Sequence, residues 1–331
     1  MYKNIFLVIL IIFMAGCSSS QVKPSTKTDV QADWYLNPPR NERLFYAVAL
    51  ADTVQKAKKI AIVNMRNSLG KEINEKFIKI NNNLSGDDKK LFQKIQKHNL
   101  EVAMRLSLSR VKLEKTQTYY GRELVLISIP KLDLFNKIKI ISDIKLNRAK
   151  QADKRALNKT SIDRLIAVKK SMNEYPTLVS LAEYKNFLLS TYDVSKEFEF
   201  LQRIKKEYDD LRNNITFYIL TDPNSKIFAK AILYMIREEG LHVENGLKTK
   251  DSFKLLITST TEETQNYAFN QSKNLVKLTT FDNNKNKIEF RQHTFIGKSK
   301  KNYKEAKKQA SRHFNYKVKK LGIFDFIGFK R

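Results

Sequence analysis

The chain has 331 residues, 42% of them apolar, with only nine glycines and six prolines. This composition excludes collagen-like and linker-like chains and is sufficient for the hydrophobic cores of about two domains. The formal net charge is +28, mostly from lysine. Such an excess either attracts an anionic partner or reflects the codon usage of an AT-rich genome.

The N-terminus has the three parts of an export signal. Lys3 is positive, Ile5 to Ala15 is an unbroken apolar run, and small residues lead to Cys17. The run is shorter than the roughly 20 residues that a membrane-spanning helix needs. We therefore predict a cleaved signal peptide over residues 1–16, followed by a polar, flexible tether that includes Cys17 and ends at residue 33. Export argues against nucleic acid as a partner.

Cys17 is the only cysteine, so no disulfide can form within the chain. The segment Met14-Ala15-Gly16-Cys17 resembles the lipobox of bacterial lipoproteins, in which Leu is more common than Met at the first position. The resemblance implies a diacylglycerol thioether on the Cys17 sulfur and a fatty acyl chain, such as palmitate, on the amino group of Cys17. Several acyl chains anchor a protein stably, whereas one is marginal. Ser18, in place of Asp, implies transfer to the outer membrane.

Residues 34–130 predict a first α+β unit. A strand over 44–50 is followed by a possible helix cap at Asp52 or Thr53. Apolar residues then recur at steps of three and four, which predicts one long amphipathic helix; they are Val54, Ala57, Ala61, Met65, Leu69, Ile73, Phe77 and Ile80. A second helix over 87–103 and strands over 106–115 and 123–129 complete the unit.

Residues 131–213 predict a helical connector, with Leu132, Phe135 and Ile138 spaced for one helix face. We expect an interruption at Asn173 to Pro176, because the residue before a proline disfavours helix. The helical pattern resumes over 178–211.

Residues 214–331 predict a second α+β unit. Its strand over 215–220 leads into a helix that starts at Thr221-Asp222-Pro223 and ends at Gly240. A brief strand over 241–243, further strands over 253–259, 274–281 and 287–295, and a helix over 300–321 follow. Strands that are mostly adjacent in sequence favour α+β over a doubly wound parallel sheet. The predicted fold is thus α+β, with two small mixed units joined by a helical connector.

The first unit resembles a known lipoprotein family. Trp34-Tyr35-Leu36-Asn37-Pro38-Pro39, the strand Phe45 to Ala49, and the later strand Glu123 to Ile127 occur in the family's order. The pattern is similar to the roughly twenty-kilodalton outer-membrane lipoprotein of Helicobacter and to the N-terminal domain of the flagellar assembly protein FlgT. Ala47 and Ala49 stand where that family usually has glycines. The resemblance covers about 34–135 and implies an envelope location and no known catalytic residues.

No motif in the sequence predicts reaction chemistry. His98, His242, His293 and His313 are not spaced as metal ligands. Gly297-Lys298-Ser299 resembles the end of a phosphate loop, but Gln292 stands where that motif needs glycine. Adjacent acidic residues do not face one another on a helix, which is typical of a solvated surface. We therefore expect no enzyme activity, no metal and no cofactor.

The C-terminal end carries the candidate binding residues. Lysines crowd a short stretch in which Glu305 is the only acidic residue. They form a solvated helix face or a binding site for phosphorylated lipid or an acidic partner. The predicted site residues are Lys300, Lys301, Lys304, Lys307, Lys308, Lys317, Lys319 and Lys320. The apolar segment from Ile323 to Phe329 is expected to dock on its own domain or to insert into a partner.

These patterns predict a non-enzymatic lipoprotein of the outer membrane, anchored by lipid at Cys17 and facing the periplasm. It would act as a structural or interaction component of an envelope assembly with a protein partner, and the resemblance to FlgT points to flagellar or motility machinery. The alternative is an accessory protein that binds or transports anionic lipid or lipopolysaccharide.

Overall fold

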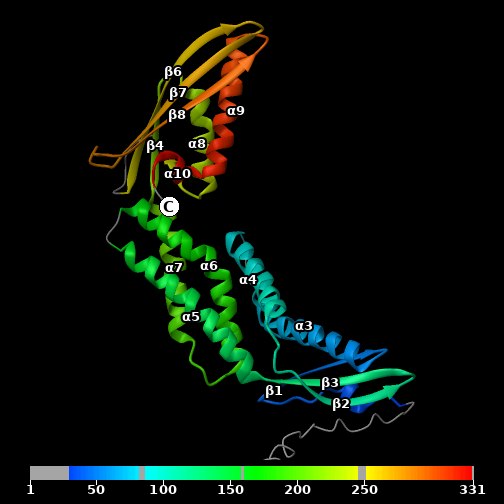
Figure 1. Cartoon of the computed structure of the whole chain (residues 1–331). Helices are drawn as coiled ribbons and strands as arrows, with labels where there is room; N and C mark the ends of the chain where they lie inside the picture. The colour runs from blue at the N-terminus through cyan, green and yellow to red at the C-terminus, as the bar shows by residue number, and fades with distance from the viewer. Residues whose placement is uncertain (1–29, 82–85, 158–159, 245–250, 330–331) are drawn as a thin grey trace, which may run out of the picture. The chain divides into compact units, whose positions relative to one another are not determined.

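The computed structural model describes residues 30–81, 86–157, 160–244 and 251–329 (Figure 1). It confirms the predicted α+β class, with two separate sheets and many helices. Within the described residues, unit 1 comprises those up to Ile141 together with Ser180–Asp193. Unit 2 comprises Ser142–Val179 and the residues from Val194 onward. The segment predicted as a connector, 131–213, is shared between the two units.

Unit 1 follows the predicted order of strand, helix, helix, strand, strand. Its elements are α2 (Asp33–Leu36), β1 (Leu44–Ala51), α3 (Val54–Asn81), α4 (Gly86–Arg105), β2 (Lys112–Tyr119) and β3 (Arg122–Pro130). The antiparallel sheet has the order β1-β3-β2. On α3, the apolar residues predicted to share one face are buried from Ala57 to Ile73, and this helix packs on β1 and β3.

The start of β2 differs from the prediction, which began the strand at Leu106. The N–H of Leu106 donates to the carbonyl of Ala103 at 3.2 Å and ends α4. The carbonyl of Leu106 accepts from Nε and Nη2 of Arg66 at 3.2 and 3.0 Å. These bonds hold Leu106 in a loop, so that β2 begins only at Lys112.

Three helices follow β3: α5 (Lys131–Arg155), α6 (Ser161–Leu188) and α7 (Ser195–Asn214). The predicted interruption at Asn173 to Pro176 is wrong, because α6 continues through Pro176. A proline inside a helix costs about 3 kcal/mol. Burial of neighbours such as Leu178 and Ala182 offsets this cost. The true breaks lie on either side of α6.

In unit 2, a buried charge network joins the three helices. Arg164 on α6 bonds Oδ1 of Asp153 on α5 at 2.5 Å and both carboxylate oxygens of Glu207 on α7. Arg203 bonds the other oxygen of Asp153 at 2.5 Å. Burial acts to raise the pKa of Asp153, but hydrogen bonds and charges from Arg203 and Arg164 outweigh it, so the pKa is lowered. The charges are thus paired where they are desolvated.

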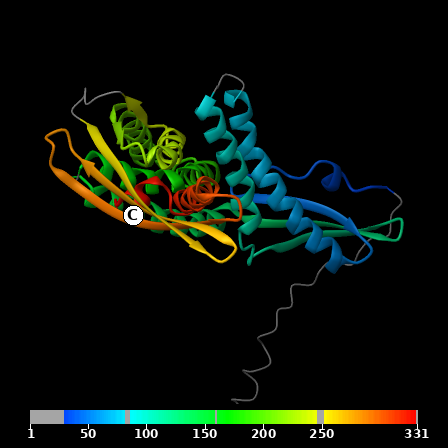
Figure 2. The same cartoon turned by 90° about the horizontal axis from the view of Figure 1, so that it is seen from above.

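The rest of unit 2 is a five-stranded sheet with helices on one face. The elements are β4 (Thr216–Thr221), α8 (Lys226–Glu238), β5 (His242–Glu244), β6 (Ser252–Asn266), β7 (Phe269–Phe281), β8 (Lys287–Ser299), α9 (Tyr303–Leu321) and α10 (Ile323–Ile327). The strand order is β5-β4-β6-β7-β8. β4 pairs in parallel with β5 and β6, and the other pairs are antiparallel. Helix α9 runs beside the long strands in Figure 1, and the view from above shows it nearly end-on against the sheet (Figure 2).

Among the element starts of this unit, those of α8 and β7 differ most from the prediction. Helix α8 begins at Lys226, not at Thr221, because Asp222 forms a turn first. The carboxylate of Asp222 accepts hydrogen bonds from the N–H of Ser225 at 2.7 Å and from the N–H of Ser259 at 2.9 Å. Strand β7 begins at Phe269, five residues before the predicted start, and forms a long hairpin with β6.

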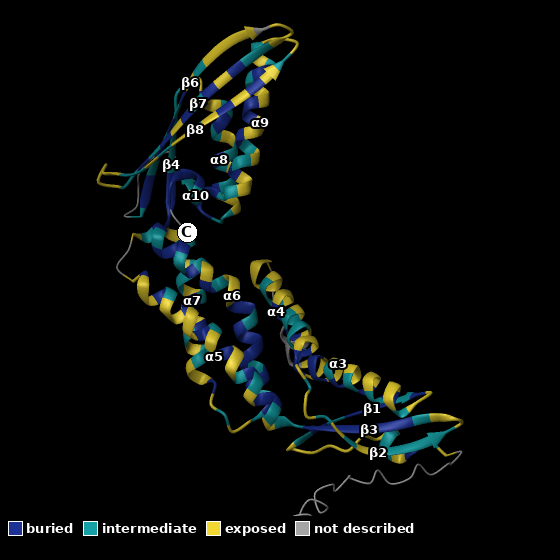
Figure 3. Cartoon of the chain, viewed as in Figure 1, coloured by how far each residue is buried: buried dark blue, intermediate teal, exposed yellow. Residues whose placement is uncertain are grey.

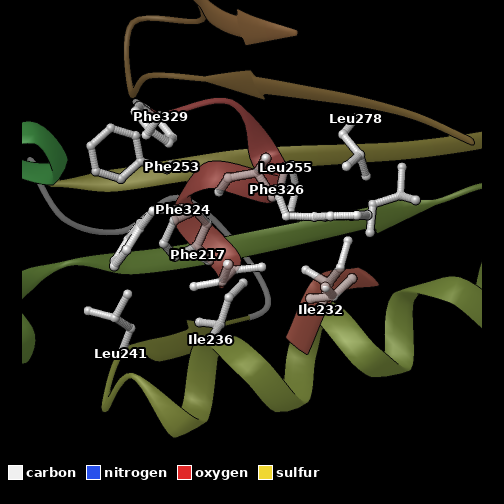
Figure 4. Close-up of a cluster of buried hydrophobic side chains, with 14 of the residues drawn as sticks. Phe217, Ile232, Ile236, Leu241, Phe253, Leu255, Leu278, Phe324, Phe326 and Phe329 are labelled. Atoms are coloured by element: carbon white, nitrogen blue, oxygen red, sulfur yellow. The ribbon is translucent and has the colours of Figure 1, made fainter. Parts of the chain in front are cut away.

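The core of unit 2 lies between the sheet and helices α8, α9 and α10 (Figure 4). β7 and β8 present alternate residues to this core and to solvent over much of their length (Figure 3). The apolar C-terminal segment is docked in the core, in agreement with the first of its two expected outcomes. Phe324, Phe326 and Phe329 are all buried, and the ring of Phe326 stacks on His293 with centroids 4.4 Å apart.

Candidate anion-binding site

The end of β8 and the start of α9 place a group of cations close together. β8 ends at Ser299, and the cap residue Asn302 accepts from the N–H of Glu305 at 2.9 Å to start α9. The short link keeps Lys300 and Lys301 beside the first turns of the helix. The N–H of Lys301 donates to Oγ of Ser299 at 3.1 Å and fixes the link further.

Gly297 sets how closely α9 lies on β8. A Cβ at this position would lie 1.9 Å from the carbonyl oxygen of Ala306 and 2.6 Å from the nitrogen of Ala310. Only glycine, with no side chain, permits this approach. In the next residue, the N–H of Lys298 donates to Oε1 of Gln309 at 3.2 Å. The strand end and the exposed side of the helix therefore form one surface.

A hollow of about 350 Å³ lies at this junction. We name it the basic hollow; its lining residues are Phe269, Lys298, Ser299, Lys300, Lys301, Glu305, Lys308, Gln309 and Arg312. Five of the nine are cations and one is an acid. The hydroxyl of Ser299 and the amide of Gln309 add neutral polar groups. Such a lining suits an oxygen-rich anion, which accepts hydrogen bonds from ammonium and guanidinium groups.

The one acidic residue shows how positive this surface is. A hydrogen bond from Nζ of Lys308 to Oε1 of Glu305, at 2.6 Å, is the main reason that the pKa of Glu305 is lowered. The charges of Lys308, Lys301 and Arg312 act in the same direction. Glu305 thus partly neutralises Lys308, while Lys298, Lys300, Lys301 and Arg312 remain in excess on the same surface.

Phe269 gives the basic hollow an aromatic wall. Nζ of Lys300 lies 5.7 Å from the centroid of its ring, within the range of a cation–π contact. Phe269 follows the β6–β7 turn in the chain, and β7 pairs with β8 so that Asn270 faces Ser299. The hairpin therefore brings an aromatic residue to a site built mainly from the sequence thirty residues later.

The structure brings together only some of the eight lysines predicted as one site. Lys300, Lys301 and Lys308 line the basic hollow, while Lys304 is exposed on α9 outside its lining and Lys307 is half-buried. Nζ of Lys317 lies 3.3 Å from Nδ1 of His293 and 5.6 Å from the ring centroid of Phe295.

Lys319 and Lys320 also lie apart from the hollow. Nζ of Lys319 is 5.9 Å from the ring centroid of Tyr234, and Lys320 is exposed near the end of α9. Both follow Lys308 by at least eleven positions, or roughly 16 Å along the helix axis. The single basic patch expected from the sequence is therefore divided, because a helix spreads consecutive lysines around its circumference and along its length.

Lys298 and Arg312 belong to the hollow, and their place in the same lysine-rich stretch is a signal for them. Phe269 is absent from the sequence prediction. The predicted strand begins at residue 274, so the sequence pattern does not place Phe269 on β7 or beside the end of β8.

Other predicted features lie elsewhere. Cys17 lies outside the described residues. Trp34 is half-buried in α2, with its ring centroid 6.4 Å from that of Tyr35.

Among the described residues, no group of three or more His, Cys, Asp or Glu residues is arranged to hold a metal ion. In the same residues, no helix is both long and apolar enough to cross a bilayer.

Comparisons with known proteins give only distant similarities. No family model matches the chain, and no curated protein matches it. The solved structures that are similar to it in part include the following two. A minor lipoprotein from Acinetobacter baumannii is 9% identical, covers 34% of this chain and 92% of its own, and has a TM-score of 0.28. A secreted protein from the human pathogen Helicobacter pylori is 12% identical, covers 88% of this chain and 100% of its own, and has a TM-score of 0.40.

Proposed function

We propose that this protein is a non-enzymatic, lipid-anchored component of the cell envelope whose unit 2 binds an anionic partner through the basic hollow. The observation that carries the proposal is the cluster of five cations around one acidic residue in a single concave surface. The bound group is oxygen-rich and negatively charged, as are phosphate groups and carboxylates.

The binding part is tested with soluble sodium polyphosphate and isothermal titration calorimetry. The variant K298E/K300E reverses two charges of the hollow. Its matched control is K285E/K287E, in which two exposed lysines at the opposite end of β8 are reversed with the same spacing. The two ends of β8 lie roughly 40 Å apart at about 3.3 Å per residue.

We expect K298E/K300E to weaken binding about tenfold or more and the control to bind nearly as wild type, because each cation near an anionic surface contributes about 1 kcal/mol. Raising the ionic strength should weaken wild-type binding, since salt screens exposed charges. Equal losses in both variants would mean that binding depends on net charge alone, and would refute the site.

Anchoring is tested at Cys17, the lipidation site predicted from the sequence. When cells are grown with radioactive palmitate, we expect radioactivity in the wild-type protein, which should lie in the outer-membrane fraction, and none in the Cys17→Ala variant. Equal labelling of both would contradict the lipoprotein prediction. The non-enzymatic part of the proposal predicts that the purified protein leaves peptidoglycan intact.

The sequence of residues 34–130 favours a second candidate, an interaction role in flagellar or motility machinery. The support is the motif from Trp34 to Pro39 together with the strands Phe45 to Ala49 and Glu123 to Ile127, which resemble the N-terminal domain of FlgT. A deletion strain should then lose swimming while its envelope stays intact. Normal swimming would remove this candidate and leave the anion-binding proposal standing.

A further inference from the structure

The turn between β6 and β7 carries two exposed aromatic residues. Asn266 pairs with Phe269, which leaves a two-residue turn of Tyr267 and Ala268. The side chain of Tyr267 is fully exposed, and 41% of Phe269 is exposed. We name residues 267–269 the aromatic tip. An aromatic residue usually buries its large apolar surface, so two at the end of a hairpin call for a physical reason.

The backbone makes Tyr267 more unusual. Its φ is +46°, a left-handed conformation that hairpin turns normally assign to Asn, Asp or Gly. A bulky residue there is an outlier that costs stability. Neither the turn geometry nor core packing therefore favours tyrosine at this position, and strain of this kind is often found at functional sites.

The aromatic tip and the basic hollow form one continuous surface. A smaller hollow of about 250 Å³ is lined by the tip together with Gln271 and Lys298. It shares Phe269 and Lys298 with the basic hollow. Phe269 therefore shares one lining with five cations, and Tyr267 shares the adjoining lining with one of them, Lys298.

This pairing matches the chemistry of a membrane interface. Aromatic rings prefer the boundary between headgroups and acyl chains, and lysines bind the phosphates just outside it. A bilayer also suits the shape, because the tip is the end of a hairpin and exposes its aromatic side chains. The cations complement the charge of anionic lipids.

We propose that the aromatic tip and the basic hollow together dock on an anionic lipid bilayer, with Tyr267 and Phe269 entering the interface and the cations holding lipid phosphates. This inference rests on the proposed anion-binding function and specifies its partner. The contact is separate from the lipid predicted on Cys17, so the protein has a second membrane contact within unit 2.

The test places a fluorescent reporter at the tip. Trp34 is the only tryptophan, so the full chain carrying Trp34→Phe and Tyr267→Trp emits from position 267 alone. It is mixed with vesicles of phosphatidylcholine, with or without about one third phosphatidylglycerol, whose acyl chains carry bromine as a quencher. Binding through the N-terminal segment does not affect this reporter unless the tip also meets the bilayer.

We expect blue-shifted, quenched emission with the anionic vesicles and little change with the neutral ones. Adding K298E/K300E should weaken this response about tenfold or more, whereas adding K285E/K287E should leave it nearly unchanged. Phe269→Ser should also weaken it, because interfacial binding scales with buried apolar area. Circular dichroism confirms that each variant is folded.

Three other outcomes would overturn the inference in distinguishable ways. Vesicle sedimentation that depends on Lys298 and Lys300, without any change in emission, would leave anion binding intact and remove insertion of the tip. A response to soluble polyglutamate but not to vesicles would identify an acidic protein as the partner. Failure to bind both vesicles and polyphosphate would refute the proposed function together with this inference.

Discussion

The replacement Gly297→Ala tests whether the close contact of β8 with α9 holds the C-terminal unit together. The new Cβ would lie 1.9 Å from the oxygen of Ala306, whereas real Cβ contacts are essentially never shorter than 3.0 Å. Strand and helix must therefore separate by more than 1 Å. Both partner atoms are backbone, so no side chain can rotate away to relieve the clash.

The expected loss of stability is about 3 kcal/mol, at the upper end for an overpacked core. For a unit of this size, that corresponds to a fall in the melting temperature of roughly 6–12 °C. Thermal unfolding followed by far-ultraviolet circular dichroism measures it. Fluorescence of Trp34, the only tryptophan, reports on unit 1 in the same samples.

Thr294→Ala is the matched control, because Thr294 is exposed on the same strand. It should change stability by no more than about 0.5 kcal/mol. If Gly297→Ala melts at the wild-type temperature, the close approach of α9 is not a real constraint, and the account of how the basic hollow is positioned fails with it.

Three further changes have definite expected outcomes. Asp153→Asn should destabilise unit 2 by about 3 kcal/mol at neutral pH, measured by unfolding in urea, because Arg164 stays buried with one charged partner fewer. Since the folded-state pKa of Asp153 is lowered, the difference in stability between wild type and variant should be complete above about pH 4 and shrink as the pH falls through that lowered pKa. A stability difference that persists in strong acid would contradict the role given to the Asp153 charge. Asn302→Ala removes the side-chain cap of α9 and should cost about 1 kcal/mol in the same assay, whereas Asn283→Ala in an exposed turn should cost almost nothing. Phe326→Ala should lower the free energy of unfolding by about 3–5 kcal/mol. Burial is the main cause that lowers the pKa of His293, so nuclear magnetic resonance of the variant should show that pKa moving back up towards its ordinary value. An unchanged pKa of His293 would refute the role of the stacked ring.

The helices and strands with a strong apolar period could be predicted from the sequence. The apolar steps from Ala57 to Ile73 on α3 correspond to buried residues because that spacing places them on one helix face. Pro176 shows the limit of such reasoning. The local preference against helix at Tyr175 is real, but burial of the residues around it depends on tertiary contacts that no local pattern contains.

The candidate site shows the same limit. Lys300, Lys301 and Lys308 could be found from local charge density alone. Phe269 could not, because its place beside Lys300 depends on the pairing of β7 with β8. By contrast, the separation of Lys317 and Lys320 from the hollow follows from helix geometry alone, because both lie at least two turns beyond Lys308 on α9.

The buried segment from Ile323 to Phe329 has a consequence for local unfolding of unit 2. Phe324, Phe326 and Phe329 lie in the shared interior of β4 to α9, so release of this segment would present that interior to proteases and chaperones. Segments that open separately from the rest of a fold are those with few buried apolar contacts. Because this segment is rich in them, we expect its backbone amides to exchange with solvent as slowly as those of the core strands.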